Sequence, residues 1–285
     1  MPVCEPGRLE RSALFQSLFL MTTTLPALIA SLLPTLSPAT SLLPAVPLSE
    51  YGWMGATIFV GACLQGVGGI GFAMLAAPLA AMFFPQLVPG PLLAMGGCLS
   101  LLAALREREA IAWRLTGTAL LGRTLGGLIG VLAIAWLRPQ WLAVVFSLSI
   151  LLAVALSALG WRVRPSAGNL AIAGTASGFM ATLTSAGAPP FAIVMQHMSP
   201  AAMRATVGCI LGGGAVLSLA MLAGAGRFGI ADLTLSALLA PFLLAGFAVS
   251  SRLKARVSAV AVRRLLLALC AAGAIAVLVR VVLQG

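Results

Sequence analysis

Two stretches decide the fold: GACLQGVGGIGFAMLAAP at residues 61–78 and GTASGFMATLTSAGAPP at residues 174–190. Each interrupts an apolar run with residues that do not support a helix, and each opens one half of the chain. Inside a bilayer a helix breaks only where protein or a water-filled cavity satisfies the freed backbone groups. Two interruptions in matching positions are the best sequence indication of a transporter's binding site.

The composition is typical of an integral membrane protein. Apolar residues make up 61% of the chain and charged residues 8%, against roughly 45–50% and about 25% in an average soluble domain. The net charge of +11 fits basic cytoplasmic loops better than nucleic-acid binding, because the chain has no nucleic-acid-binding motif. The five cysteines show no CxxC spacing, which indicates neither a disulfide framework nor a metal site.

The chain divides into three parts. Residues 1–47 hold a hydrophobic segment, either a signal peptide or an extra span, and a Pro-rich linker. Residues 48–165 and 166–285 each begin with a long apolar stretch, at 51–84 and 168–198. Each stretch is too long for one crossing and short for two, so we expect a re-entrant pair of short arms that meet at a turn. Ordinary spans are expected at residues 88–105, 113–137, 141–160, 201–223, 231–250 and 262–282.

The placement of Lys and Arg favours an inverted arrangement of the two halves. If each broken stretch returns to the side from which it entered, the second half is inverted relative to the first. Thirteen of the 17 basic residues then fall on one side, three on the other, and Arg123 lies inside a span. If each broken stretch crosses once, the division is nine to seven. The positive-inside rule therefore predicts an all-α membrane protein with two inverted repeats and cytoplasmic basic loops.

The candidate substrate-binding residues lie at the two breaks. A helix end inside the membrane presents free N–H groups and a partial positive charge, which suits an anion. The alternatives are close helix packing for the glycines and local bonding to carbonyls for the hydroxyl groups. The candidates are Gln65, Gly66, Gly68, Gly69 and Gly71 at the first break, and Thr184, Ser185, Gly187, Pro189 and Pro190 at the second.

Arg123 is the charged residue predicted near mid-membrane, where a charge is costly and indicates a functional site. Its guanidinium can hold an oxyanion through two parallel hydrogen bonds; the alternative is structural pairing with helix-end carbonyls. All six Asp and Glu residues fall in tails, loops or helix ends, so we expect an anionic substrate. His197 and Arg204 lie near the predicted inner face, as gate and inner-mouth residues or as plain interfacial ones.

At these breaks the chain resembles the TauE/SafE family of sulfite exporters. That family carries a Gly-x-Gly-Gly-Gly type break followed by Pro, and later a Gly-x-Gly-Gly-Pro-Pro type break. The matching stretches here are residues 66–71, followed by Pro78, and residues 185–190, with Ile70, Ser185 and Ala188 in place of glycines. The resemblance covers roughly residues 51–282 and implies movement of sulfite or small organosulfonates across the inner membrane, usually outward.

The inverted repeats predict a secondary transporter that works by alternating access. An anion channel and a carrier for another small anion, such as a carboxylate, are the alternatives. An enzyme is not expected, because the chain has one His, no mid-span acid and no paired Cys. We expect no cofactor; the expected partners are a small anion and the lipid bilayer, with a homodimer left open.

Overall fold

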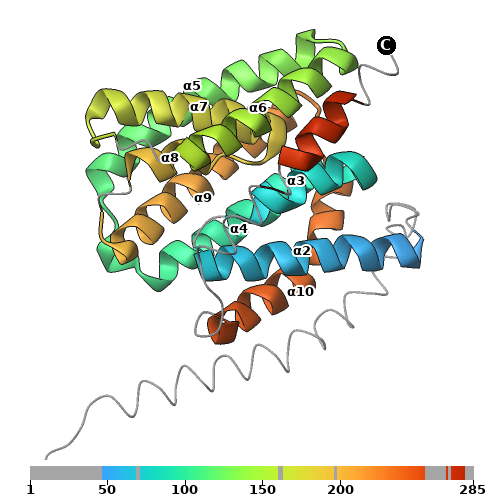
Figure 1. The fold of residues 1–285 in the computed structure, drawn as a ribbon, viewed down its shortest axis with the longest axis horizontal. Helices are drawn as coiled ribbons and strands as arrows, with labels where there is room; N and C mark the ends of the chain where they lie inside the picture. The colour runs from blue at the N-terminus through green and yellow to red at the C-terminus, as the bar shows by residue number, and fades with distance from the viewer. Residues whose placement is uncertain are drawn as a thin grey trace, which may run out of the picture. The chain divides into compact units, whose positions relative to one another are not determined.

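The computed structural model describes residues 47–68, 71–159, 163–195, 198–253, 268 and 271–279. The regular elements in these residues are all helices (Figure 1), which confirms the all-α expectation. The elements are α2 (Leu48–Gly68), α3 (Phe72–Phe83), η2 (Pro85–Leu87), α4 (Gly90–Arg106), η3 (Arg108–Ala110), α5 (Trp113–Trp136), α6 (Pro139–Leu159), α7 (Ala167–Thr184), α8 (Pro189–Val194), α9 (Pro200–Gly224) and α10 (Ile230–Leu253). The N-terminal hydrophobic segment and most of the last expected span lie outside the described residues.

Both breaks fall where the sequence places them, but the arms of the first are unequal. Helix α2 has 21 residues, about 31 Å at 1.5 Å per residue, whereas α3 has 12. The expectation of two short arms is therefore wrong for the first arm, which is long enough to reach across a bilayer. Gly66 is helical and lies directly against α10, where a Cβ on Gly66 would meet the Ser250 hydroxyl.

Three described helices are long and apolar enough to cross a membrane: Trp113–Trp136, Ala201–Gly224 and Ile230–Arg252. Shorter apolar helices cover Phe72–Phe83, Gly90–Arg106 and Gln140–Leu152. Helix α5 carries exposed apolar side chains along its outer face, among them Leu121, Leu125 and Trp136. Such a face suits contact with lipid.

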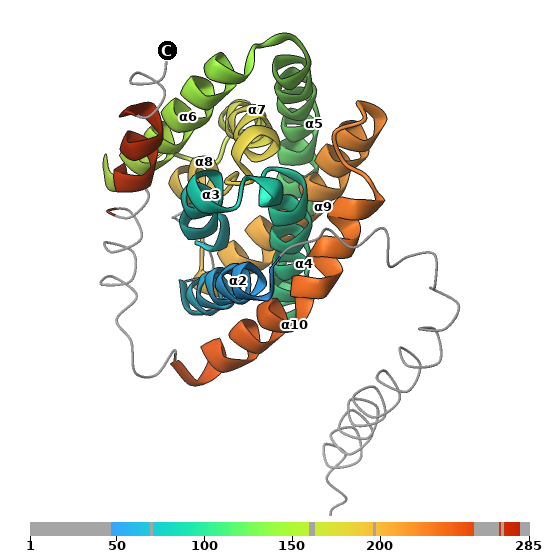
Figure 2. The ribbon, with the colours of Figure 1, turned by 90° about the vertical axis from the view of Figure 1, so that its right-hand side faces the viewer.

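Two pairs of helices pack closely and run in the same direction. On α5, Gly122 lies against Ala171 of α7 and Gly130 lies against Thr182 further along α7. Helices α2 and α10 pair in the same sense: Gly55 contacts Phe242, and Gly66 contacts Ser250. Figures 1 and 2 show α5 with α7 on one side of the bundle and α2 with α10 on the other.

Helices α4 and α9 lie between these pairs and run in opposite directions. Gly97, near the middle of α4, lies against Ala215 of α9, whereas Ala104, near the end of α4, lies against Gly208, earlier in α9. Helix α6 packs against α8. The helical residues 271–279 lie against α3, because a Cβ on Gly273 would meet Pro78.

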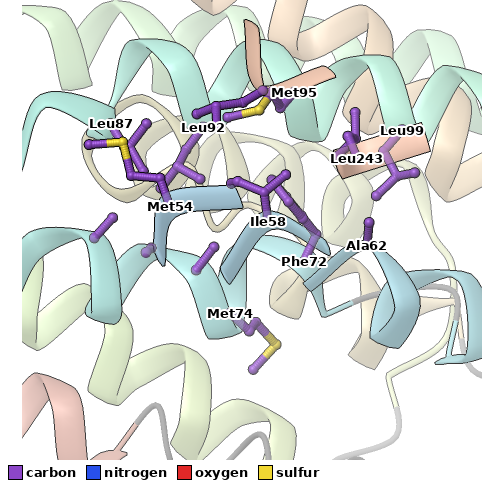
Figure 3. Packing of buried hydrophobic residues seen from close by; sticks show 14 of the residues in the cluster. Met54, Ile58, Ala62, Phe72, Met74, Leu87, Leu92, Met95, Leu99 and Leu243 are labelled. Carbon is purple, nitrogen blue, oxygen red and sulfur yellow. The ribbon is translucent and has the colours of Figure 1, made fainter. Parts of the chain in front are cut away.

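The main apolar core joins α2, α3, α4 and α10 (Figure 3). Phe72, the first residue of α3, is fully buried there beside Ile58 and Ala62 of α2. Inside a bilayer such a side chain stabilises the fold through van der Waals packing against its neighbours, because lipid is as apolar as the core. The core therefore fixes the start of the return arm α3 at the end of the first break.

Candidate functional site

The first break is a glycine turn between α2 and α3. Gly71 precedes α3 with a φ of 143°, a backbone conformation that other residues rarely adopt. The Gln65 carboxamide spans this break: Phe72 N–H donates to its Oε1 at 3.2 Å, and its Nε2 donates to Ser100 Oγ of α4 at 3.4 Å. Gln65 thus satisfies a backbone group that the end of the helix frees.

The second break is capped by its own hydroxyl groups. Ser185 ends α7 in the left-handed conformation, with a φ of 61°, and its Oγ donates to the Pro89 carbonyl at 2.8 Å. Thr184 Oγ1 donates to the Met180 carbonyl at 2.7 Å and accepts from Ala186 N–H at 3.2 Å. The Thr184 bonds pair two nearby backbone groups, and the Ser185 bond joins the end of α7 to the start of α4.

A cavity of about 40 Å³ lies between the two breaks, among buried and partly buried residues. The first half of the chain contributes polar Gln65, Ser100 and Arg123 to its wall, and the second half contributes Ser185 and Gly187. The remaining lining residues are small or apolar: Gly71, Phe72, Ala73, Met74, Leu93, Gly96, Gly97, Ala181, Ala186, Ala188, Leu211 and Ala215. The structure therefore brings the two predicted breaks together around one space.

Arg123 supplies the charge of this cavity. Its side chain lies near the middle of α5, is 2% exposed, and donates from Nη1 to Ser177 Oγ of α7 at 2.6 Å. Ser177 Oγ in turn donates to the Gly187 carbonyl in the second break. Its Nε is buried and has no hydrogen-bond partner in the structure as described.

No acidic side chain within the described residues pairs with Arg123, and none lines the cavity. An Arg at the centre of a membrane helix costs about 2.5–3.5 kcal/mol on insertion scales. A hydrogen bond to a charged group contributes about 1.5–3 kcal/mol, so the bond to Ser177 by itself does not offset this cost. The cavity thus holds a buried cation that an anion would complete.

Two glycines make room for the guanidinium. A Cβ on Gly214 of α9 would lie 1.8 Å from Arg123 Nε, and a Cβ on Gly187 would lie 2.8 Å from Nη1. Neither position tolerates a side chain while Arg123 keeps its place. Gly214 therefore packs against the Arg123 side chain itself, whereas Gly212 packs against Leu101 of α4.

Several predicted site residues lie away from the cavity. Gly66 faces α10, Gly68 is the last residue of α2, and Gly69 lies outside the described residues. Pro189 and Pro190 are buried as the first two residues of α8, where their lack of an N–H costs nothing. Like Thr184, they shape the second break without lining the cavity.

The two inner-face candidates have different outcomes. Arg204 Nε donates to Glu107 Oε2 at 3.2 Å, and the two side chains form a partly buried ion pair. Its charge is therefore compensated, and the pair joins the start of α9 to the loop after α4. His197 lies outside the described residues.

Sequence reasoning missed Ser177, Ser100 and Gly214. Each is a small residue inside an apolar helix, and helical spacing alone does not tell which neighbouring helix it faces. The signal available for Ser177 is its position in the helix that precedes the second break. Only the contact between α5 and α7 reveals that it faces Arg123.

The fold and the cavity define an all-helical membrane protein with a buried, positively charged cavity between two helix breaks. The model of the sulfite exporter TauE/SafE family matches residues 53–277, and the chain belongs to that family. It is thus a multi-pass membrane transporter and not an enzyme, and membership implies transport of sulfite- or organosulfonate-type anions. No curated protein and no solved structure matches the chain.

Proposed function

We propose that the protein is a secondary transporter that carries a compact oxyanion of the sulfite type across the inner membrane by alternating access. The observation that carries the proposal is Arg123, a buried cation without an acidic partner among the described residues, in a cavity between two helix breaks. A bound oxyanion would pair with the guanidinium. Gln65, Ser185 and the backbone of the breaks would supply the directional hydrogen bonds.

The size of the cavity favours a small anion. A single water needs roughly 10–15 Å³ of such space, so a cavity of about 40 Å³ has room for only a few water-sized groups. An ion of one central atom and three oxygens is of this size. An organosulfonate needs additional space for its organic substituent, so a cavity of this volume favours the smaller ion.

The helix directions support two inverted repeats, at residues 48–165 and 166–285. Exchange of the two halves turns the α2–α10 contact into the α7–α5 contact, and the contact of residues 271–279 with α3 into that of α6 with α8. The antiparallel pair α4 and α9 is exchanged with itself, as expected for a two-fold axis in the membrane plane. This symmetry agrees with the scheme that places 13 basic residues on the cytoplasmic side.

The packing also suggests which parts move. Helix α5 packs on α7 and α9, whereas α10 packs on α2 and α4. Helices α2, α3, α4 and α10 would form one rocking body and α5, α7, α8 and α9 the other, and the closely packed pair α4 and α9 would form the contact between the two bodies. The cavity lies between these bodies, because Gln65 and Phe72 belong to the first and Arg123 and Gly187 to the second.

Export, an inner-membrane location and cytoplasmic basic loops complete the proposal, and they rest on the family and on the charge distribution. A homodimer stays a prediction. The two opposed helix breaks favour a carrier over an anion channel, because paired broken helices are typical of alternating-access transporters.

The test is sulfite efflux from loaded proteoliposomes, comparing the parent protein, Arg123→Ala and the control Arg138→Ala. Arg138 is exposed between α5 and α6. We expect saturable efflux with counterflow for the parent and the control. Loss of one partner of a buried charge pair costs about 2–5 kcal/mol, so Arg123→Ala should weaken half-saturation by at least about thirtyfold.

Each other outcome of this experiment excludes a part of the proposal. Flux without counterflow would indicate a channel. Parent-like half-saturation in Arg123→Ala would place the anion elsewhere. If the protein transports a carboxylate but not sulfite, the substrate class is carboxylates and not oxyanions of the sulfite type. Ethanesulfonate, added as a competitor, should inhibit more weakly than sulfite if the cavity size selects the substrate.

A further inference from the structure

We propose that Ser177 is a positioning residue of this transporter: it orients the Arg123 guanidinium toward the substrate cavity and holds the second break in place with the same hydroxyl. The inference rests on the proposed function. Ser177 lies in α7, is 0% exposed, and is not part of the cavity wall. It would therefore act on the anion through Arg123 and Gly187.

The Ser177 hydroxyl accepts one hydrogen bond and donates another. A serine hydroxyl has one O–H donor and two acceptor positions. Its donor goes to the Gly187 carbonyl, and one acceptor position receives Arg123 Nη1 at 2.6 Å. The guanidinium, which only donates, and the carbonyl, which only accepts, are thus joined through a group that does both.

Neighbouring residues restrict the position of the Arg123 guanidinium on two sides. Nη1 is tied to Ser177, and Nε lies so close to Gly214 that a Cβ there would overlap it. Ser177, Gly187 and Gly214 all come from the second half of the chain, whereas Arg123 comes from the first. Since Ser177 accepts only one of the five guanidinium N–H groups, donors remain for an anion.

The same hydroxyl links the cation to the shape of the second break. The Gly187 carbonyl lies between α7 and α8, where no helical partner is available for it. Without the hydroxyl, both this carbonyl and Nη1 lose their partner inside a buried site. Removal of Ser177 should therefore weaken anion binding more than it slows the change of access.

The experiment measures sulfite efflux from proteoliposomes at varied internal sulfite for the parent, Ser177→Ala and the control Ser236→Ala. Ser236 of α10 is also buried, but its hydroxyl bonds within its own helix, to the Asp232 carbonyl. We expect half-saturation to rise about tenfold in Ser177→Ala, with the maximal rate within about twofold of the parent, because a bond to a charged group is lost. The control should match the parent in both quantities.

A second variant covers the case in which Ser177→Ala does not fold. Ser177→Cys keeps nearly the same volume with a weak S–H donor, and we expect the same rise in half-saturation. Parent-like half-saturation in either folded variant, or a fall in maximal rate alone, would overturn the role of Ser177 and leave the transporter proposal intact. Absence of any sulfite flux in the parent would overturn both.

Discussion

At the residue scale, the site depends on how a buried arginine is accommodated. Arg123 has no acidic partner among the described residues, and its neighbours are a hydroxyl and two glycines. A carboxylate at this place would neutralise the guanidinium and compete with an anion for it. A serine holds the guanidinium in position and leaves its charge for the substrate.

Gly214→Ala should impair transport, whereas the neighbouring Gly213→Ala should not. A Cβ at position 214 would lie 1.8 Å from Arg123 Nε, while one at position 213 would meet only the Leu120 side chain at 3.5 Å. Overpacking costs about 1–3 kcal/mol, so sulfite half-saturation should rise about tenfold in Gly214→Ala. The comparison uses efflux from proteoliposomes that contain equal amounts of folded protein. Equal transport by the two variants would contradict the close contact between Arg123 and α9.

At the element scale, glycines set the distance between the helices that carry the site. Gly122 and Gly126 on α5 face Gly174 and Gly178 on α7, so the two backbones approach closely. This small-xxx-small pattern is typical of membrane helix pairs, where close packing replaces the hydrophobic driving force. The close approach places Ser177 of α7 within hydrogen-bond reach of Arg123 of α5.

Gly178→Ala should destabilise the folded protein in detergent, and Gly168→Ala in the same helix should not. A Cβ at position 178 would lie 2.3 Å from the Arg123 carbonyl oxygen, whereas one at position 168 meets nothing within 4 Å. Backbone atoms cannot rotate away, so α5 and α7 must separate, at a cost of about 1–3 kcal/mol. The measurement is the Tm of each purified variant. A Tm for Gly178→Ala as high as that of Gly168→Ala would show that this interface is looser than described.

At the scale of the whole molecule, the directions of the helices carry more information about the membrane topology than their lengths do. The parallel pairs α5–α7 and α2–α10 and the antiparallel pair α4–α9 agree with one inverted arrangement. In that arrangement the loop at residues 107–112 faces the cytoplasm and the loop at residues 225–229 faces outward. The ion pair between Arg204 and Glu107 would then lie on the cytoplasmic side.

Single cysteines introduced as Glu109→Cys and Arg227→Cys, in a chain without its five natural cysteines, test this topology. Glu109 lies in η3 and Arg227 in the loop after α9; both are exposed and lie within the described part of the chain. A membrane-impermeant maleimide should label Arg227→Cys in intact cells, and Glu109→Cys only after permeabilisation. If each broken stretch crossed the membrane once, both cysteines would lie on the same side and label together.

The sequence by itself determined the membrane class, the positions of the breaks and the residue that carries the charge. These properties are local: apolar content selects the bilayer as solvent, glycine and proline end helices wherever they occur, and a mid-span arginine is costly in any neighbourhood. Gln65, Ser185 and Gly187 could be proposed from the sequence because they lie at or beside the breaks. In the structure all three line the cavity.

Only the tertiary structure decided which helix faces which. Helical spacing shows that Gly66 and Ser177 lie on particular faces, but the identity of the partner helix depends on packing across the whole bundle. That packing directs Gly66 toward Ser250 of α10 and Ser177 toward Arg123, and it pairs Arg204 with Glu107. The members of these pairs are 54 to 184 residues apart in the chain, a distance over which no local pattern in the sequence carries information.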